Sequence, residues 1–188
     1  GGRLWKVEAG GDALRGYLFA GPDLPHLRQA YMELTGRPPV PPKKMFGLWM
    51  SEFGYDRWQE VDSTLEGLRA DHFPVDGFVL DLQWFGGILF TGTRPSRMGS
   101  LRWDLTRFPS PREQIAAYRE REGIAFIAIE ESYVDDSLPE HADLKSRGFL
   151  VRRGCATCEP VGIPETWWGR GGMLDWTLDA AADHWHDT

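Results

Sequence analysis

Residues 45–82, MFGLWMSEFGYDRWQEVDSTLEGLRADHFPVDGFVLDL, carry the pattern that decides the fold. Within them, residues 45–51 and 76–82 are predicted to be strands, and residues 59–71 to be an amphipathic helix. The second strand is a short, continuous apolar run. Such a run beside an amphipathic helix is typical of a parallel sheet that is covered on both faces. The stretch therefore predicts a strand–helix–strand unit of an α/β protein.

The alternation of strands and helices continues towards the C-terminus. The further predicted elements are a helix at residues 111–122, a strand at 124–129, a helix at 138–146, a strand at 172–177 and a helix at 179–187. Four such strands fit either a doubly wound sheet or half of a (β/α)8 barrel, because a whole barrel needs about 250 residues. The last helix runs directly into the C-terminus, so we expect a truncated chain.

A proline-rich segment at residues 37–44, RPPVPPKK, precedes the alternating pattern. Its prolines exclude a helix or a central strand, so the segment is predicted to be an extended linker. Upstream we expect a hairpin at residues 4–8 and 14–19, followed by a helix that begins after the N-cap residue Asp23. The linker is therefore expected to separate two structural units.

Charge and hydropathy exclude several classes of protein. The chain has 21 Lys and Arg against 28 Asp and Glu, a net charge of -7, so we expect no nucleic-acid partner held through phosphate neutralisation. The longest nearly apolar run covers only residues 84–90, whereas a membrane-spanning helix needs about 20. The N-terminus has no apolar segment of the signal-peptide kind, and the compartment, cytoplasmic or secreted, stays open.

Cys155 and Cys158 form a lone CxxC pair in a predicted loop. A structural zinc site takes four ligands, and the chain has no second pair of this kind, so we expect no metal. A redox pair would open a helix after a strand, which this pair does not. Free thiols and a disulfide local to the loop both remain open.

Acidic residues lie at or near the end of each predicted strand: Glu52, Asp81, Glu130 with Glu131, and Asp175. Aromatic residues lie close to them in the chain: Phe53, Tyr55, Trp84, Tyr133, Trp167, Trp168 and Trp176. In both architectures the active site lies at the carboxyl ends of the strands. Carboxylates accept hydrogen bonds from sugar hydroxyls and aromatic faces cover a pyranose ring, so the pattern indicates a saccharide cleft. Glu130 and Glu131 point to opposite faces, so at most one faces the cleft.

Four stretches of the chain resemble glycoside hydrolase family 31, the α-glucosidase and α-xylosidase family. They are YLFAGPDLPHLRQAYMELTGRPPVPPKKMFGLWMSEFGY, FPVDGFVLDLQWFGG, WDLTRFPSPREQI and WWGRGGMLDWT. The proline linker that leads into GLWMSEFGY is the most specific part. The resemblance implies a catalytic (β/α)8 TIM barrel behind an N-terminal β-sandwich. Residues 1–44 would be the end of that sandwich and its connector, and residues 45–188 the first half of the barrel.

The resemblance also implies residues of the −1 subsite, which holds the glycone. The family's hydroxyl-binding Asp falls on Asp81, with Leu82 beside it. The other pocket positions fall on Phe53, Tyr133 and Trp168, the last in preference to Trp167. No cofactor is implied, because the family chemistry needs only carboxylates and water. The implied partner is an oligosaccharide or another α-glycoside substrate.

The chain departs from the family pattern in ways that bear on function. Many members have a second Asp at the position of Gln83 and Asp-Pro at Glu130-Glu131, so the sugar and the linkage are not predicted. The family's nucleophile and acid/base would both lie beyond residue 188, and Asp175 matches an element upstream of the nucleophile. We therefore expect a fragment of a retaining α-glycosidase that supplies the glycone pocket but no catalytic residue and is inactive alone.

Two alternatives stay open. The chain could be a complete, non-catalytic carbohydrate-binding or scaffold domain, which would have to dimerise to cover its open sheet edges. It could also belong to a transglycosylase, which shares the pocket and passes the glycosyl group to a sugar instead of water. The oligomeric state is not predicted.

Overall fold

The structure is a computed structural model that describes residues 6, 8, 10, 13–91, 95–155 and 157–188. The chain divides into two compact units, Gly1–Pro41 and Pro42–Thr188, which are described separately. Among the described residues, no helix has the length and apolar character needed to cross a membrane.

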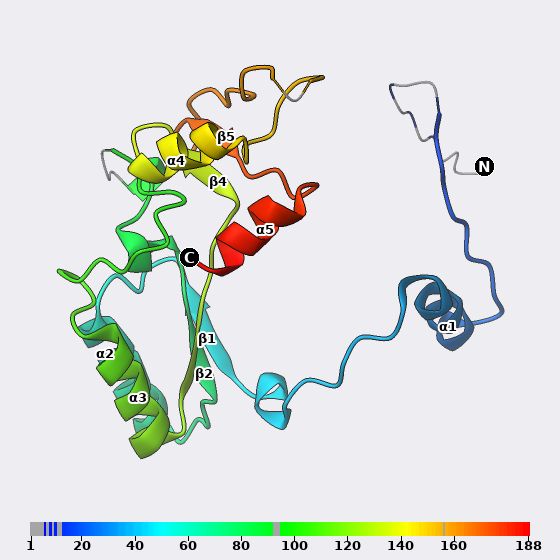
Figure 1. Cartoon of the computed structure of the whole chain (residues 1–188). Helices are drawn as coiled ribbons and strands as arrows, with labels where there is room; N and C mark the ends of the chain where they lie inside the picture. The colour runs from blue at the N-terminus through cyan, green and yellow to red at the C-terminus, as the bar shows by residue number, and fades with distance from the viewer. Residues whose placement is uncertain (1–5, 7, 9, 11–12, 92–94, 156) are drawn as a thin grey trace. The chain divides into compact units, whose positions relative to one another are not determined.

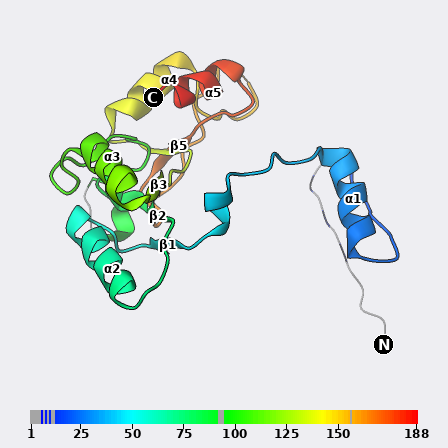
Figure 2. The same cartoon turned by 90° about the horizontal axis from the view of Figure 1, so that it is seen from below.

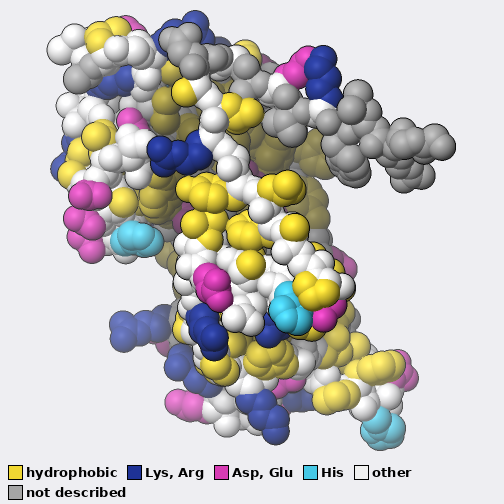
Figure 3. Space-filling model, turned by 90° about the vertical axis from the view of Figure 1, so that its right-hand side faces the viewer, with side chains coloured by type: hydrophobic (Ala, Val, Ile, Leu, Met, Phe, Trp, Pro, Cys, Tyr) yellow, Lys and Arg dark blue, Asp and Glu magenta, His cyan; other side chains and the backbone are white. Residues whose placement is uncertain are grey.

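The N-terminal unit contains one helix, α1 (Leu24–Thr35), in its described part. Asp23 caps it as predicted, because its Oδ1 accepts the backbone N–H of His26 at 3.0 Å. None of the helix side chains is buried, and exposed hydrophobic side chains are visible on the face drawn in Figure 3. The predicted strand at 14–19 is not formed, since among the described residues this segment has no strand assignment. Most of the other hairpin arm, residues 4–8, lies outside the described residues.

The second unit is built on a parallel sheet in the order β1-β2-β3. Its strands are β1 (Trp49–Glu52), β2 (Gly77–Leu80) and β3 (Ala125–Ala128). Trp49, Gly77 and Ala125 are partners in the register. A Cβ at position 77 would lie 2.3 Å from the Trp49 ring and 2.7 Å from the Ala125 carbonyl oxygen, so glycine allows this close packing.

Two helices, α2 (Trp58–Ala70) and α3 (Pro111–Glu122), pack side by side on one face of this sheet (Figure 1). Trp58 lies between them and the sheet, with ring centroids 5.1 Å from Phe108 and 5.7 Å from Phe126. The strand and helix predictions for this region are confirmed to within a few residues. In this chain the helices cover one face of the sheet, and Ser51 and Ile127 on the opposite face are exposed. Three strands are too few to close a barrel around that face.

Short 3₁₀ helices precede or follow the parallel strands. They are η1 (Lys43–Phe46), η2 (Leu82–Phe85) and η3 (Leu89–Thr91). η1 takes the place of the first residues of the strand predicted at 45–51, and η2 begins at the last residue of the strand predicted at 76–82. The remaining elements form a second region, in which α4 (Pro139–Arg147) and α5 (Asp179–His186) lie together, apart from α2 and α3 (Figure 2).

The second region contains an antiparallel pair, β4 (Tyr133–Asp135) and β5 (Gly171–Met173). The prediction of a fourth parallel strand at 172–177 is therefore wrong, and β4 was not predicted. The pairing depends on Gly171, where a Cβ would lie 2.0 Å from the Val134 carbonyl oxygen. A separate small core supports this pair: Val134, Leu144, Leu150, Leu174, Ala181 and Trp185.

Candidate functional site

Asp81 lies at the carboxyl end of β2, where the strand turns into η2. Its Oδ1 accepts the backbone N–H of Leu82 at 2.7 Å, so the carboxylate caps the short helix. Trp84 then turns into the core and donates its indole N–H to the carbonyl oxygen of Ile129, at 2.8 Å, just after β3. These bonds hold the Asp81 carboxylate at the edge where β2 and β3 end together.

Phe53 follows β1 at the same edge, and its backbone is bonded to a side chain from the segment just after β2. Its carbonyl oxygen accepts a hydrogen bond of 2.5 Å from Nε2 of Gln83. The Phe53 ring is 41% exposed and lies 6.1 Å, centroid to centroid, from that of Phe90. Gln83 is only 4% exposed, and its buried Oε1 has no hydrogen-bond partner among the described residues. A buried amide thus positions an exposed aromatic residue beside the Asp81 strand.

Tyr133 and Trp168 form a stacked pair, with ring centroids 5.1 Å apart and an angle of 9° between the planes. Trp168 is anchored through its carbonyl oxygen, which accepts a hydrogen bond from Ser96 Oγ. The neighbouring carbonyl oxygen, of Trp167, accepts the backbone N–H of Phe90 at 2.8 Å. The pair therefore connects the start of β4 with the segment that precedes β5.

The five predicted substrate-binding residues differ in exposure. Phe53 is exposed, and Asp81 and Tyr133 are half-buried. Leu82 and Trp168 are each only 2% exposed and belong to one hydrophobic core, against which Tyr133 packs. The structure thus places two of the five at neighbouring strand ends and the other three in or against that core. Their role in binding stays a prediction.

The predicted row of acids is only partly formed. Glu52, Asp81 and Glu131 lie at or just beyond the ends of the three parallel strands, whereas Asp175 lies after β5, outside the parallel sheet. Burial raises the pKa of the Glu131 carboxyl, and the negative charge of Asp81 raises that pKa further. Glu130 is exposed. Both acids lie beyond the end of β3 at Ala128, so which of them faces a cleft stays a prediction.

Other aromatic residues also depart from the predicted cleft. Tyr55 and Trp84 are core residues, whereas Trp167 and Trp176 are exposed. Sequence reasoning missed Phe90, which lies against Phe53, because it falls in an irregular segment with no periodic pattern. It noticed Gln83 only as a departure from the family, although the hydrogen bond to Phe53 gives this residue a definite structural role.

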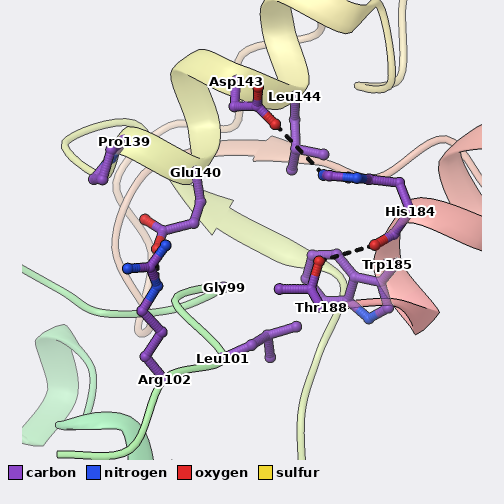
Figure 4. A pocket seen from close by; sticks show the side chains of 10 residues that line it. All are labelled: Gly99, Leu101, Arg102, Pro139, Glu140, Asp143, Leu144, His184, Trp185 and Thr188. Carbon is purple, nitrogen blue, oxygen red and sulfur yellow. Dashed lines mark hydrogen bonds and ion pairs between the residues drawn. The ribbon is translucent and has the colours of Figure 1, made fainter.

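A cavity of about 290 Å³ lies between α4, α5 and the segment at 99–102 (Figure 4). An ion pair between Arg102 and Glu140 at 3.1 Å and a contact between His184 Nε2 and Asp143 Oδ2 at 3.4 Å border it. None of the five predicted residues lines this cavity. It is therefore separate from the edge of the parallel sheet.

Cys155 and Cys158 are joined in a disulfide, which settles the alternative that the spacing left open. Over the described part of the chain, no group of three or more His, Cys, Asp or Glu residues is arranged to hold a metal ion.

Residues 38–188 match the family model of the glycosyl hydrolases family 31 TIM-barrel domain. The alpha-xylosidase XylQ of Lactiplantibacillus pentosus is 27% identical over 179 residues, covering 94% of this chain and 22% of that protein. Alpha-glucosidase 2 of Bacillus thermoamyloliquefaciens is 29% identical over 180 residues, covering 95% of this chain and 21% of that protein. The chain thus spans about a fifth of the length of these relatives.

Solved structures share the fold. A GH31 dextranase from Flavobacterium johnsoniae, complexed with glucose, matches with a TM-score of 0.74 and 22% identity, covering 89% of this chain and 19% of that chain. The three parallel strands and their helices are thus part of a TIM-barrel architecture. Because the family model covers most of the chain, the chain belongs to glycoside hydrolase family 31, in the TIM-barrel domain of that family.

Proposed function

We propose that this chain supplies the glycone-binding part of a retaining α-glycosidase that hydrolyses O-glycosidic bonds. The observation that carries the proposal is that Asp81 and the exposed Phe53 directly follow two strands paired in register, so both residues lie at the same edge of the sheet. The active site of a TIM-barrel enzyme lies at this end of its strands. An α-glucoside or α-xyloside is the substrate class that the named relatives suggest.

In this proposal Asp81 accepts hydrogen bonds from glycone hydroxyls. Its Oδ1 is oriented by the Leu82 N–H, so the carboxylate is positioned before the sugar binds, which reduces the ordering cost of binding. Phe53 offers an aromatic face to the apolar side of the ring. Tyr133, stacked on Trp168, would form a second wall, and Leu82 would support Asp81 from the core.

The reaction itself would use two further carboxylates. One attacks the anomeric carbon to form a glycosyl-enzyme, and the other protonates the leaving oxygen and then activates water. In retaining enzymes these two carboxyl groups are about 5–5.5 Å apart. We propose that neither lies among residues 1–188, so that this chain alone binds the glycone without cleaving it.

We also propose that residues 1–44 are the end of a β-sandwich and its connector. The support is that α1 buries none of its side chains, although Leu24, Tyr31 and Leu34 are large and hydrophobic. A helix of this length is marginal in water without a packing partner. A neighbouring sheet would supply that partner.

The test is the Asp81→Asn variant of the protein as its source produces it. We expect kcat/KM on aryl α-glucosides and α-xylosides to fall by about 100-fold or more, because hydrogen bonds from hydroxyls to a charged acceptor are lost. The exposed Asp71, at the end of α2, provides the matched control Asp71→Asn. Unchanged kinetics in Asp81→Asn would reject the assignment. If the wild-type protein binds saccharides without any turnover, a binding domain is favoured. If it transfers the glycosyl group to an added sugar, a transglycosylase is favoured.

A further inference from the structure

We propose that Phe90 is an aglycone-binding residue, whose exposed ring continues the aromatic surface of Phe53 and stacks on the second sugar ring of an α-linked disaccharide or a longer oligosaccharide. The proposal rests on the proposed function, because it assumes that Phe53 lies against the glycone. It goes beyond that function by assigning a contact to the sugar that leaves, and a residue that makes it.

A short, closed turn presents Phe90 at the surface. Ile88, two residues earlier, is fully buried, and the Thr91 hydroxyl donates a hydrogen bond of 2.6 Å to the Ile88 carbonyl oxygen. The Ile88 N–H donates to the oxygen of that hydroxyl at 3.1 Å. The Phe90 N–H donates to the Trp167 carbonyl oxygen at 2.8 Å. The Phe90 backbone is therefore held both by bonds within its own turn and by the segment that precedes β5.

The Phe90 side chain is 73% exposed, although phenylalanine is one of the residue types most often found buried. Its ring lies against the exposed ring of Phe53, with centroids 6.1 Å apart. Exposed apolar side chains that occur singly are common and need no functional explanation. Here two of them, from η3 and from the end of β1, meet as one aromatic surface. Such a surface suits a ligand with apolar faces.

The angle between the two rings indicates what this surface would hold. Their planes are tilted by 49°, so one flat pyranose ring cannot stack on both. Two pyranose rings joined through a glycosidic oxygen can turn relative to each other, and each can place its apolar face on one aromatic ring. With the glycone on Phe53, the sugar on Phe90 is the adjacent one, which leaves when the glycosidic bond is cleaved.

The experiment compares substrates that share a glycone but differ in the aglycone, with the protein as its source produces it. Maltose and isomaltose have a second pyranose ring, and methyl α-D-glucoside has none; isoprimeverose and methyl α-D-xyloside are the corresponding xylosides. In Phe90→Ala we expect kcat/KM on the disaccharides to fall by about 10-fold, the size of one lost aromatic stacking contact. The loss on the methyl glycosides should be clearly smaller.

Two further variants at the same position test whether the flat ring is what matters. Phe90→Tyr keeps an aromatic face and should retain the wild-type ratio of kcat/KM on disaccharides to kcat/KM on methyl glycosides. Phe90→Leu keeps apolar bulk without that face and should lose the ratio as Phe90→Ala does. Full retention in Phe90→Leu would overturn the proposal, because stacking would then not be the contact.

Phe73 provides the matched control. It is another exposed phenylalanine, but it lies between α2 and β2, before the amino end of the strand, so Phe73→Ala should leave the ratio unchanged. Equal losses on both kinds of substrate in Phe90→Ala, or no loss at all, would overturn the proposal. A lower unfolding midpoint with an unchanged ratio would also overturn it, because Phe90 would then be a packing residue.

The Asp81→Asn variant separates this proposal from the proposed function. If it loses activity on every substrate while Phe90→Ala keeps the wild-type ratio, the role of Phe90 is rejected and the proposed function stands. If Asp81→Asn keeps wild-type kinetics on every substrate, the proposed function fails and the role of Phe90 fails with it. Should the wild type bind these saccharides without cleaving them, the ratio of dissociation constants from calorimetry replaces that of kcat/KM, with the same expectations.

Discussion

The two halves of the second unit are stabilised in different ways. The parallel half, β1-β2-β3 with α2 and α3, is organised around large aromatic side chains, with Trp58 in contact with Phe108, Tyr118 and Phe126. The antiparallel half, β4-β5 with α4 and α5, depends on a close approach of two backbones at Gly171. The parallel half thus rests on a large aromatic core, whereas the antiparallel half has a smaller core and a strand pairing that requires glycine at position 171.

Removal of the central aromatic residue should have the largest effect. Trp58→Ala should lower the free energy of unfolding by about 3–5 kcal/mol, because it leaves a cavity between helix and sheet and removes the hydrogen bond from the indole to the Pro109 carbonyl oxygen. Chemical denaturation measures the loss. The exposed Trp167→Ala is the control, and an equal loss there would contradict the dependence on the buried core.

A methyl group at Gly171 tests the antiparallel half. Gly171→Ala should lower stability by about 2–4 kcal/mol, since the new Cβ overlaps the Val134 carbonyl oxygen and the strands must separate. Hydrogen exchange should then accelerate in β4 and β5 but not in β1-β2-β3. Gly162→Ala, where nothing lies within 4 Å of the added Cβ, should leave exchange unchanged. Uniform acceleration over both halves would show that they unfold as one.

The same contrast explains what could be predicted from the sequence. Strands and helices of the parallel half follow local patterns, such as the buried strand near Phe78 and the apolar stripe of α2 with Val61 and Leu65, so they were predicted within a few residues. β4 is three residues long and exists only through pairing with a segment more than 30 residues away, which no local pattern reveals.

The candidate site shows the same limit. Asp81 and Phe53 lie at strand ends, and sequence reasoning placed them there. The partners of Phe53, by contrast, are set by the tertiary structure. Gln83 donates a hydrogen bond to the Phe53 carbonyl oxygen, and Phe90, from an irregular segment, lies beside the Phe53 ring. The stacking of Tyr133 on Trp168 also joins segments that are distant in sequence.

Gln83 permits a test of the bond that holds Phe53. Gln83→Met keeps the volume of the side chain but removes the donor to the Phe53 carbonyl oxygen, so stability should fall by about 1 kcal/mol. Affinity for glycosides should fall with it if Phe53 forms a pocket wall. The exposed Gln59→Met, on α2, is the control for the added thioether. Full affinity together with reduced stability would restrict Gln83 to a structural role.

Glu131→Gln should produce the smallest change in stability and the one with a distinctive pH dependence. The folded-state pKa of Glu131 lies above its ordinary value of 4.5, so the folded protein binds this proton more tightly than the unfolded chain. The wild type therefore loses stability as the pH rises from about 4.5 through the higher folded-state pKa. At pH 7 the variant should be slightly more stable than the wild type, and the difference should vanish below about pH 4. Glu130→Gln should show no such trend. A gain that persists at low pH would mean that ionisation of Glu131 is not its cause, and that the interaction between the ends of β2 and β3 is not electrostatic.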